Sequence, residues 1–249
     1  MIVTAYKTPP IVVGNDLFSI LDSCLPAIID NDVVVITSKI ISITQRRVVK
    51  NNPSVDKKDL IHKECDRYLT HEAMPRYGFI LTITNNILIA NSGIDESNGN
   101  GYYILWPEHL QETTNEIWRY LKKNYSIKNL GVIVTDSHSM ILRWGVMGVG
   151  LSWCGFSPLN RYIDEPDVFG RVFHSVNASV LDGLASSAVT VMGEGNEQTP
   201  LAVIRDVPFV QFQDHVPTDT ELDALKISIE DDLYAPLLTS VPWVNGGRS

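Results

Sequence analysis

The segment Leu130-Gly131-Val132-Ile133-Val134-Thr135-Asp136-Ser137 places an apolar run directly before three polar residues. The run predicts a buried strand, because β-branched residues favour extended backbone and short apolar runs lie inside sheets. We expect this strand to stop at Thr135, which would hold Asp136 rigidly at a strand end. Val33-Val34-Val35-Ile36 predicts a second buried strand, which runs into the polar turn Thr37-Ser38-Lys39.

The remaining elements alternate without a regular strand–helix–strand rhythm, which predicts a mixed α/β fold with mixed sheets and packed helices. No linker divides the 249 residues, so we expect a single domain over 1–249, either as one body or as two intimately associated lobes. After residue 206 the sequence is uninformative. The predicted elements are a short helix capped by Asn15 and ending near Pro26, a helix over 59–69, a hairpin over 79–90 turning at Asn85-Asn86, a helix starting at Pro107, a buried helix over 176–191 and a strand over 201–204.

The composition excludes several classes of protein. A net charge of −9 argues against general nucleic-acid binding, because a phosphate backbone needs a basic face. No apolar stretch approaches the roughly 18–20 residues that cross a bilayer, and the N-terminus lacks the pattern of a signal peptide. The three cysteines Cys24, Cys65 and Cys154 are far apart, which favours reduced, buried thiols in a cytosolic protein.

Three acidic residues stand in glycine- or serine-rich turns beside buried elements: Asp95, Asp136 and Glu194. A hard divalent cation takes several oxygen ligands, which carboxylates, hydroxyls and phosphates supply. The combination predicts a site that holds Mg²⁺ or Mn²⁺ against the phosphates of a nucleotide. Taken singly, each acid has a simpler explanation, since Asp commonly closes turns and caps helices. Only the three together favour the metal site.

The segment Gly145-Val146-Met147-Gly148-Val149-Gly150 is open to two explanations. It is neither a Walker A sequence nor a dinucleotide fingerprint, because no Lys-Ser/Thr pair follows and the expected acid is missing. Tight strand or helix packing accounts for it at least as well as close approach to a ligand. Arg143, just before it, is a candidate catalytic residue that would steady a transferred phosphate, with a surface arginine as the alternative.

Four motifs occur in the order found in one enzyme family. They are Val35-Ile36-Thr37-Ser38-Lys39-Ile40-Ile41-Ser42, Asn91-Ser92-Gly93-Ile94-Asp95-Glu96-Ser97-Asn98, Val132-Ile133-Val134-Thr135-Asp136-Ser137 and Val191-Met192-Gly193-Glu194. The linking features Leu105-Trp106-Pro107, Arg143-Trp144-Gly145 and Asp167-Val168-Phe169-Gly170-Arg171 are also similar. Over residues 8 to 206 the chain therefore resembles the coenzyme F420-0:γ-glutamyl ligases.

The resemblance implies roles for individual residues. Two divalent ions would bind to Asp95, Asp136, Ser137 and Glu194, and the first two of these acids would be catalytic. It also implies Mg²⁺ or Mn²⁺, GTP (or ATP) as co-substrate and an intertwined homodimer. Nucleotide contacts are implied for Pro10, Ile11, Val12, Val13, Ser38, Lys39, Asn98, Met192, Gly193, Glu194, Gly195, Asn196, Glu197, Gln198 and Thr199.

Two stretches depart from the family pattern. Ile43-Thr44-Gln45-Arg46 stands where the family has a second lysine and a Glu-Gly-Arg turn, and His138 follows the second acid where the family commonly has Phe. These departures leave the nucleotide and the acceptor open. The segment His71–Gly78 and the Leu105-Trp106-Pro107 turn are more similar to a bacterial branch associated with folate γ-glutamylation.

We therefore expect a cytosolic ligase that joins L-glutamate to an acceptor carboxylate through an acyl phosphate. The acceptor would be a folate or an F420-0-like cofactor. Two alternatives stay open: a degraded ligase that binds nucleotide and metal as a dimer without turnover, and a purely structural or interaction protein.

Overall fold

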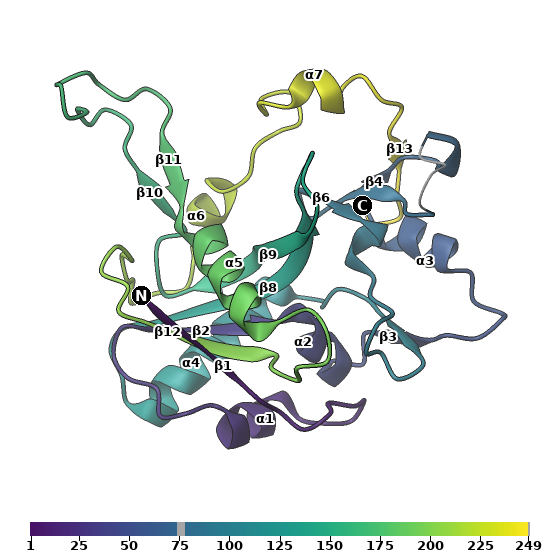
Figure 1. The fold of residues 1–249 in the computed structure, drawn as a ribbon, viewed down its shortest axis with the longest axis horizontal. Coiled ribbons are helices and arrows are strands. Elements are labelled where there is room, and N and C mark those ends of the chain that lie inside the picture. Colours follow the sequence, from purple (N-terminus) through teal and green to yellow (C-terminus); the bar gives the residue numbers. More distant parts are fainter. Residues whose placement is uncertain (74–77, 249) are drawn as a thin grey trace.

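A computed structural model of the chain describes residues 1–73 and 78–248. Over these residues the fold is mixed α/β, as predicted, with seven α-helices and four sheets of different size (Figure 1). Residues 74–77 of the segment His71–Gly78 lie outside the described residues. No helix in the described ranges is both long and apolar enough to cross a membrane. The three cysteines are free thiols, as predicted; Cys65 and Cys154 are buried, whereas Cys24 is half-buried, so the prediction of burial is wrong for Cys24.

The larger part of the molecule is built on a five-stranded sheet. Strand β2 (Asp32–Thr37) pairs in parallel with β8 (Leu130–Ser139), and all other neighbours pair antiparallel. The two parallel strands are buried in the middle of the sheet, which explains their uninterrupted Val and Ile runs. In sheet order the strands are β1 (Ile2–Tyr6), β12 (Leu201–Arg205), β2 (Asp32–Thr37), β8 (Leu130–Ser139) and β9 (Val146–Cys154).

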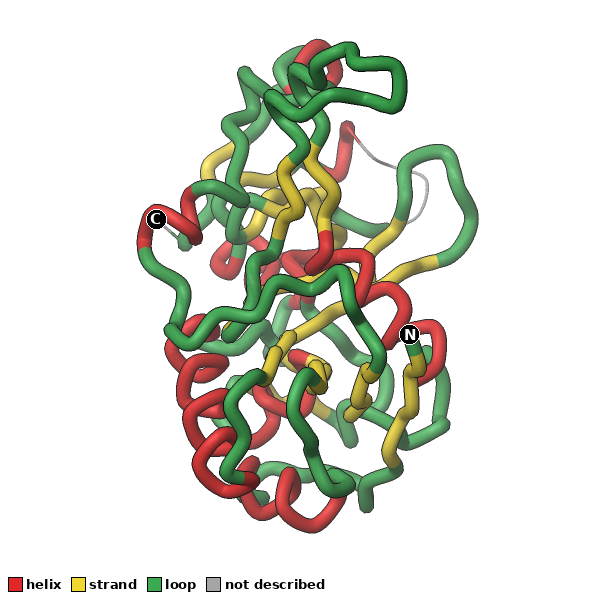
Figure 2. The backbone as a smooth tube through the Cα atoms, turned by 90° about the vertical axis from the view of Figure 1, so that its left-hand side faces the viewer, coloured by secondary structure: helices red, strands yellow, loops and turns green. Residues whose placement is uncertain are grey.

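Helices cover both faces of this sheet. One face packs against α1 (Leu17–Cys24), α2 (Ser38–Thr44) and α4 (Leu110–Tyr125) through a core that includes Leu21 and Ile117. The other face packs against α5 (Val180–Met192) through Leu181 and its neighbours. Viewed from the side, most of the helical turns gather in the lower half of the molecule (Figure 2).

A smaller part of the molecule has its own core, formed by Ile61, Ile80, Ile94, Tyr103 and Leu105. The hairpin of β5 (Leu81–Thr84) and β6 (Ile87–Ala90) turns at Asn85-Asn86, as predicted, with both residues at positive φ. The smaller part of the molecule contains a four-stranded sheet in the order β13 (Val244–Asn245), β4 (Arg67–Tyr68), β5 (Leu81–Thr84) and β6 (Ile87–Ala90). It also contains a two-stranded sheet of β3 (Val48–Lys50) and β7 (Tyr102–Ile104), and helix α3 (Lys57–Glu64).

Two segments extend from these parts. Strands β10 (Leu159–Arg161) and β11 (Asn177–Ser179) form a long hairpin that projects outward (Figure 1). The C-terminal segment passes through α6 (Asp219–Asp223) and α7 (Ala235–Leu238) before β13 pairs with β4. The segment that was uninformative in sequence thus reaches back across the molecule to complete the smaller sheet.

The first two predicted helices have different boundaries. Helix α1 is capped by Asp16, which accepts the Ser19 N–H at 2.8 Å, whereas Asn15 accepts the Val12 N–H before the helix begins. Helix α3 ends at Glu64 and does not reach residue 69, because the extended Cys65 leads the chain into β4 and its pairing with β5.

The two later helices begin after their predicted starts. Helix α4 begins at Leu110 and not at Pro107, since His109 has left-handed backbone (φ 47°). Helix α5 begins at Val180 because Ser179 caps it, and residues 177–179 belong to β11 instead. Periodicity therefore located both helices, while a turn and a strand pairing set where they begin.

The glycines of β9 are explained by packing. A Cβ atom at Gly148 would lie 2.4 Å from the carbonyl oxygen of Ala185, and one at Gly150 would lie 2.3 Å from Leu181. Both neighbours belong to α5, so these glycines let the helix lie directly on the strand. The packing explanation for the glycine-rich segment is confirmed.

Candidate active site

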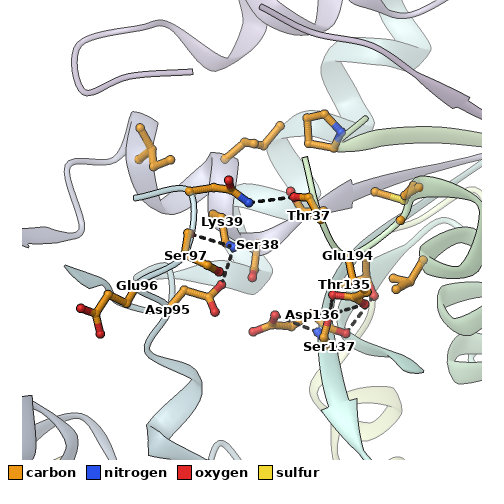
Figure 3. A pocket seen from close by; sticks show the side chains of 18 of the residues that line it. Thr37, Ser38, Lys39, Asp95, Glu96, Ser97, Thr135, Asp136, Ser137 and Glu194 are labelled. Atoms are coloured by element: carbon orange, nitrogen blue, oxygen red, sulfur yellow. Dashed lines mark hydrogen bonds and ion pairs between the residues drawn. The ribbon is translucent and has the colours of Figure 1, made fainter. Parts of the chain in front are cut away.

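A cavity of about 920 Å³ lies between the five-stranded sheet and the smaller part of the molecule (Figure 3). All but two of the predicted site residues line it, so segments far apart in sequence meet there. Those that line it are Pro10, Ile11, Val12, Ser38, Lys39, Asp95, Asn98, Asp136, Ser137 and the run 192–199.

Asp136 lies within strand β8 and not at its end. The strand continues to Ser139, which differs from the prediction, and a β-bulge between Val134 and Thr135 shifts its register against β9. Such a bulge re-aims the side chains that follow it. Asp136 is half-buried and accepts the Ser137 N–H at 2.8 Å and the Trp106 indole N–H at 2.5 Å.

Asp95 comes from the opposite wall. A short 3-10 turn over Asn91–Gly93 precedes it, and its backbone exchanges hydrogen bonds with Ile104. The Lys39 ammonium, from the first turn of α2, lies 2.9 Å from an Asp95 carboxylate oxygen. In Figure 3 the Asp95 and Asp136 carboxylates are turned toward the gap between the two walls.

The segment after α5 closes a third side. The Ser137 hydroxyl lies 2.7 and 2.8 Å from the two carboxylate oxygens of Glu194 and donates to them. The Asn98 side-chain amide donates to the carbonyl oxygen of Gly195 at 2.9 Å. These contacts tie the segment that follows α5 to both the β8 wall and the Asp95 loop.

The charges in the cavity are unbalanced. Five carboxylates line it, from Asp95, Glu96, Asp136, Glu194 and Glu197, against the two ammonium groups of Lys39 and Lys57. Burial, and then the negative charge of Asp95, raises the pKa of Asp136 to about 7, although the hydrogen bonds from Ser137 and Trp106 oppose this shift. A cavity of this kind favours cations.

The side chains present fit a hard divalent cation in their chemistry. Asp95, Asp136, Ser137 and Glu194 offer only oxygen atoms as ligands, which a hard cation prefers. A cation would also reduce the repulsion between these closely spaced carboxylates. Within the described residues, however, no three His, Cys, Asp or Glu side chains are gathered closely enough to form a ready-made metal site. The proteins that bind Mg²⁺ often use only one or two carboxylates and complete the coordination with phosphate and water.

Two predicted residues lie outside the lining of this cavity. Val13 lines a smaller neighbouring hollow of about 190 Å³, which it shares with Ile11, Val12 and Asn98. Arg143 is exposed in the turn between β8 and β9, between the almost fully exposed Leu142 and Trp144. The structure therefore does not bring the Arg143 side chain together with the three acids.

Sequence reasoning missed several residues of the site. Trp106 was noted only as part of a linking turn, yet it donates a hydrogen bond to Asp136. Lys57 and Phe79 line the cavity without any preceding signal in the sequence, as do Ile89 of β6 and Val146 of β9. Their positions depend on how the smaller part packs against the sheet, which no local pattern reveals.

Comparison with known proteins identifies the family. The model of the F420-0:γ-glutamyl ligase family matches residues 5–206. A coenzyme F420:L-glutamate ligase from Methanococcus maripaludis strain C7 is 31% identical over 220 residues, covering 82% of this chain and 88% of the relative. Relatives of the same name from Methanosarcina barkeri strain Fusaro (31% over 210 residues, 79% and 82% covered) and Methanocaldococcus jannaschii (31% over 195 residues, 72% and 78% covered) agree.

The matched range includes all three acids and every segment that lines the cavity. The resemblance inferred from the four motifs is thus confirmed over most of the chain. The chain is an acid–amino-acid ligase and belongs to the F420-0:γ-glutamyl ligase family.

Proposed function

We propose that this enzyme uses a nucleoside triphosphate and divalent metal ions to join L-glutamate to the carboxylate of a small cofactor. The observation that carries the proposal is the single cavity in which Asp95, Asp136 and Glu194 meet the nucleotide-contact segments implied by the family resemblance. A triphosphate would be repelled by the five carboxylates, because the two ammonium groups balance only part of their negative charge. Bound divalent ions would supply the missing positive charge and neutralise the phosphates.

The reaction requires an activated carboxylate, because a carboxylate itself is a poor electrophile. The γ-phosphoryl group passes to a carboxylate oxygen of the acceptor, which yields an acyl phosphate and the nucleoside diphosphate. The glutamate amine then attacks the acyl carbon, an amide bond forms, and inorganic phosphate leaves with the C–O bond electrons. The protein contributes mainly by positioning and electrostatics, so no protein nucleophile is needed.

Named side chains have specific tasks in this scheme. Asp95, Asp136, Ser137 and Glu194 would hold the metal ions, which agrees with their oxygen donors and shared cavity. Lys39 and Asn98 would contact the nucleotide, since both side chains lie beside the Asp95 loop. The exposed Arg143 would reach substrate only if its turn moved, and we assign it no step.

The acceptor is a small cofactor that ends in a carboxylate. The names of the relatives favour an F420-0-type acceptor. The Leu105-Trp106-Pro107 turn favours a reduced folate as second candidate through its similarity to the bacterial branch. The cavity volume of about 920 Å³ lies near the upper end of the range for small-molecule pockets, roughly 300–1,000 Å³, and does not distinguish the two acceptors.

The proposal is tested by incorporation of labelled glutamate, with F420-0 and reduced folates supplied side by side and GTP compared with ATP. Asp95→Asn and Asp136→Asn should each abolish incorporation, whereas Asp223→Asn, on the exposed surface of α6, should leave it unchanged. Nucleotide binding without phosphate release for any acceptor would instead identify a degraded ligase. Full activity of both cavity variants would exclude the assigned metal ligands.

We also propose that two copies of the chain form a homodimer through the projecting hairpins. The β8–β9 turn exposes Leu142 and Trp144 by 99% and 98%, and the β10–β11 hairpin exposes Val168 and Phe169 by 92% and 93%. The free energy of the protein falls when a partner covers such apolar side chains. Sedimentation should show a dimer that Phe169→Ser weakens and Leu233→Ser, at another exposed site, does not. A monomer at all concentrations would contradict this.

A further inference from the structure

We propose that Trp106 is a positioning residue that holds Asp136 in the orientation required to bind a divalent cation. The inference rests on the proposed function, because it takes Asp136 as a metal ligand. The Trp106 indole N–H donates to Oδ2 of Asp136 at 2.5 Å, and the Ser137 backbone N–H donates to Oδ1 at 2.8 Å. One donor on each oxygen fixes the carboxylate plane, and each oxygen keeps a lone pair for a ligand in the cavity.

Trp106 itself has little freedom to move. Its side chain is only 3% exposed. Gly93 lies against the indole with φ +71°, and a Cβ atom there would lie 2.1 Å from the indole nitrogen. Gly93 is two residues before Asp95, so the loop that carries one acid packs on the ring that orients the other. The indole therefore fixes the position of Asp136 relative to the Asp95 loop.

The chain at and just after Trp106 is anchored by the segment that follows α2. Arg47 donates to the Trp106 carbonyl oxygen at 3.2 Å and forms an ion pair with Glu108 at 2.9 Å. The Gln45 side chain accepts the Glu108 N–H at 3.1 Å and donates to the Glu108 carbonyl oxygen at 3.2 Å. Gln45 belongs to the stretch that departs from the family pattern, and this contact gives that departure a structural role.

An indole is suited to this task. It donates one hydrogen bond, carries no charge that would compete with a cation, and has no lone pair with which to bind the metal itself. Loss of a hydrogen bond that orients a metal ligand typically weakens metal binding by about 10–100-fold. Loss of the indole N–H should therefore be measurable as a loss of affinity for the metal.

The test is Mn²⁺ binding to the metal-free full-length protein, followed by electron paramagnetic resonance of the free ion. Trp106→Phe removes the N–H and part of the ring, and replacement of Trp106 by 3-benzothienylalanine removes only the N–H. Trp118→Phe and Trp153→Phe are controls that each lose a buried indole elsewhere. The Trp118 indole N–H donates to the Leu130 carbonyl oxygen at 2.8 Å, and the Trp153 indole nitrogen has no hydrogen-bond partner among the described residues.

Both replacements of Trp106 should weaken Mn²⁺ binding by about tenfold or more, while both controls stay within about twofold of the unmodified protein. Unchanged affinity in the benzothienylalanine protein would overturn the positioning role, and so would an equal loss in either control. If the unmodified protein bound no Mn²⁺, the proposed function would fail and this inference with it.

Discussion

The Lys39 ammonium lies 2.9 Å from the Asp95 carboxylate, across the cavity from Asp136. The same ammonium lies 3.4 Å from the Ser97 carbonyl oxygen, so it is held by the loop that carries the acid. Among the described residues, Lys39 is thus the cation that forms an ion pair with a proposed metal ligand. A divalent ion on Asp95 would displace it, and the released ammonium would face the nucleotide phosphates.

Lys39→Met should therefore separate metal binding from nucleotide binding. Nucleotide affinity should fall by about 10–100-fold, the range expected when a charge-assisted hydrogen bond is lost. Mn²⁺ affinity should stay the same or rise, because no ammonium competes for Asp95. Calorimetric titrations with each ligand measure both effects, and Lys123→Met, on the exposed side of α4, is the matched control. A parallel loss of both affinities would contradict the exchange of partners.

Mn²⁺ binding should depend on pH through Asp136. The raised pKa of about 7 means that the carboxyl holds a proton in the metal-free protein at lower pH, and the metal must displace it. Below about pH 7 the affinity should fall by about tenfold per pH unit, and above that it should level off. Titrations across this range check the sign. An affinity independent of pH would show that Asp136 is not a ligand.

The same raised pKa predicts a stability effect in the metal-free protein. The folded chain holds this proton more tightly than the unfolded chain, whose pKa stays near 3.8. The stabilisation is therefore complete below about pH 3.8 and is lost as the pH rises through about 7. Relative to Asp136→Asn, which has no such proton, the Tm of the unmodified protein should decline over this window. Thermal denaturation at matched pH values measures the difference, and a constant difference would exclude the shift.

Elements with strong local signals were predicted well. The Val33–Ile36 and Leu130–Val134 runs are strands because β-branched residues and burial act together over a few residues, and Asn85-Asn86 sets its own turn. Helix ends were predicted poorly, since adjacent residues such as Asn15 and Asp16 are both good caps. Only the geometry of the preceding turn decided between them.

All but two of the predicted site residues line one cavity, but the contacts inside that cavity were not predictable. Asp95, Asp136 and Glu194 were all placed in one cavity, as the motif order implied. The contact between Trp106 and Asp136 spans 30 residues and depends on how the bulged strand meets the Asp95 loop. No periodicity in the sequence records such a relationship, because it arises from packing between two parts of the fold.

Gly148→Ala should destabilise the fold without entering the cavity. Its Cβ atom would lie 2.4 Å from the Ala185 carbonyl oxygen, so α5 would have to move away from β9. Overpacking of this kind costs about 1–3 kcal/mol. Gly183→Ala, in α5, is the matched control, because nothing lies within 4 Å of the Cβ position at Gly183. This variant should stabilise the fold by about 0.5–1 kcal/mol. Denaturant unfolding measures both, and equal signs would contradict the packing explanation.

Asn98→Gly should weaken nucleotide binding with little effect on stability. The Asn98 amide joins the Asp95 loop to the Gly195 carbonyl oxygen at 2.9 Å, and its backbone has φ 55°, which glycine adopts without strain. The variant therefore removes the side-chain amide and also removes the conformational strain of the left-handed backbone at this position. Loss of the proposed hydrogen bond from this amide to the nucleotide is worth about 1 kcal/mol, so nucleotide affinity should fall by about fivefold.

Asn98→Ala gives the necessary comparison, because alanine removes the same amide but retains the cost of a left-handed backbone. Its nucleotide affinity should match that of Asn98→Gly, while its Tm should be lower. If the glycine variant bound nucleotide as tightly as the unmodified protein, the amide would serve only to close the loop. Equal affinities in the two variants, both reduced, would assign the loss to the side chain that joins the two walls of the cavity.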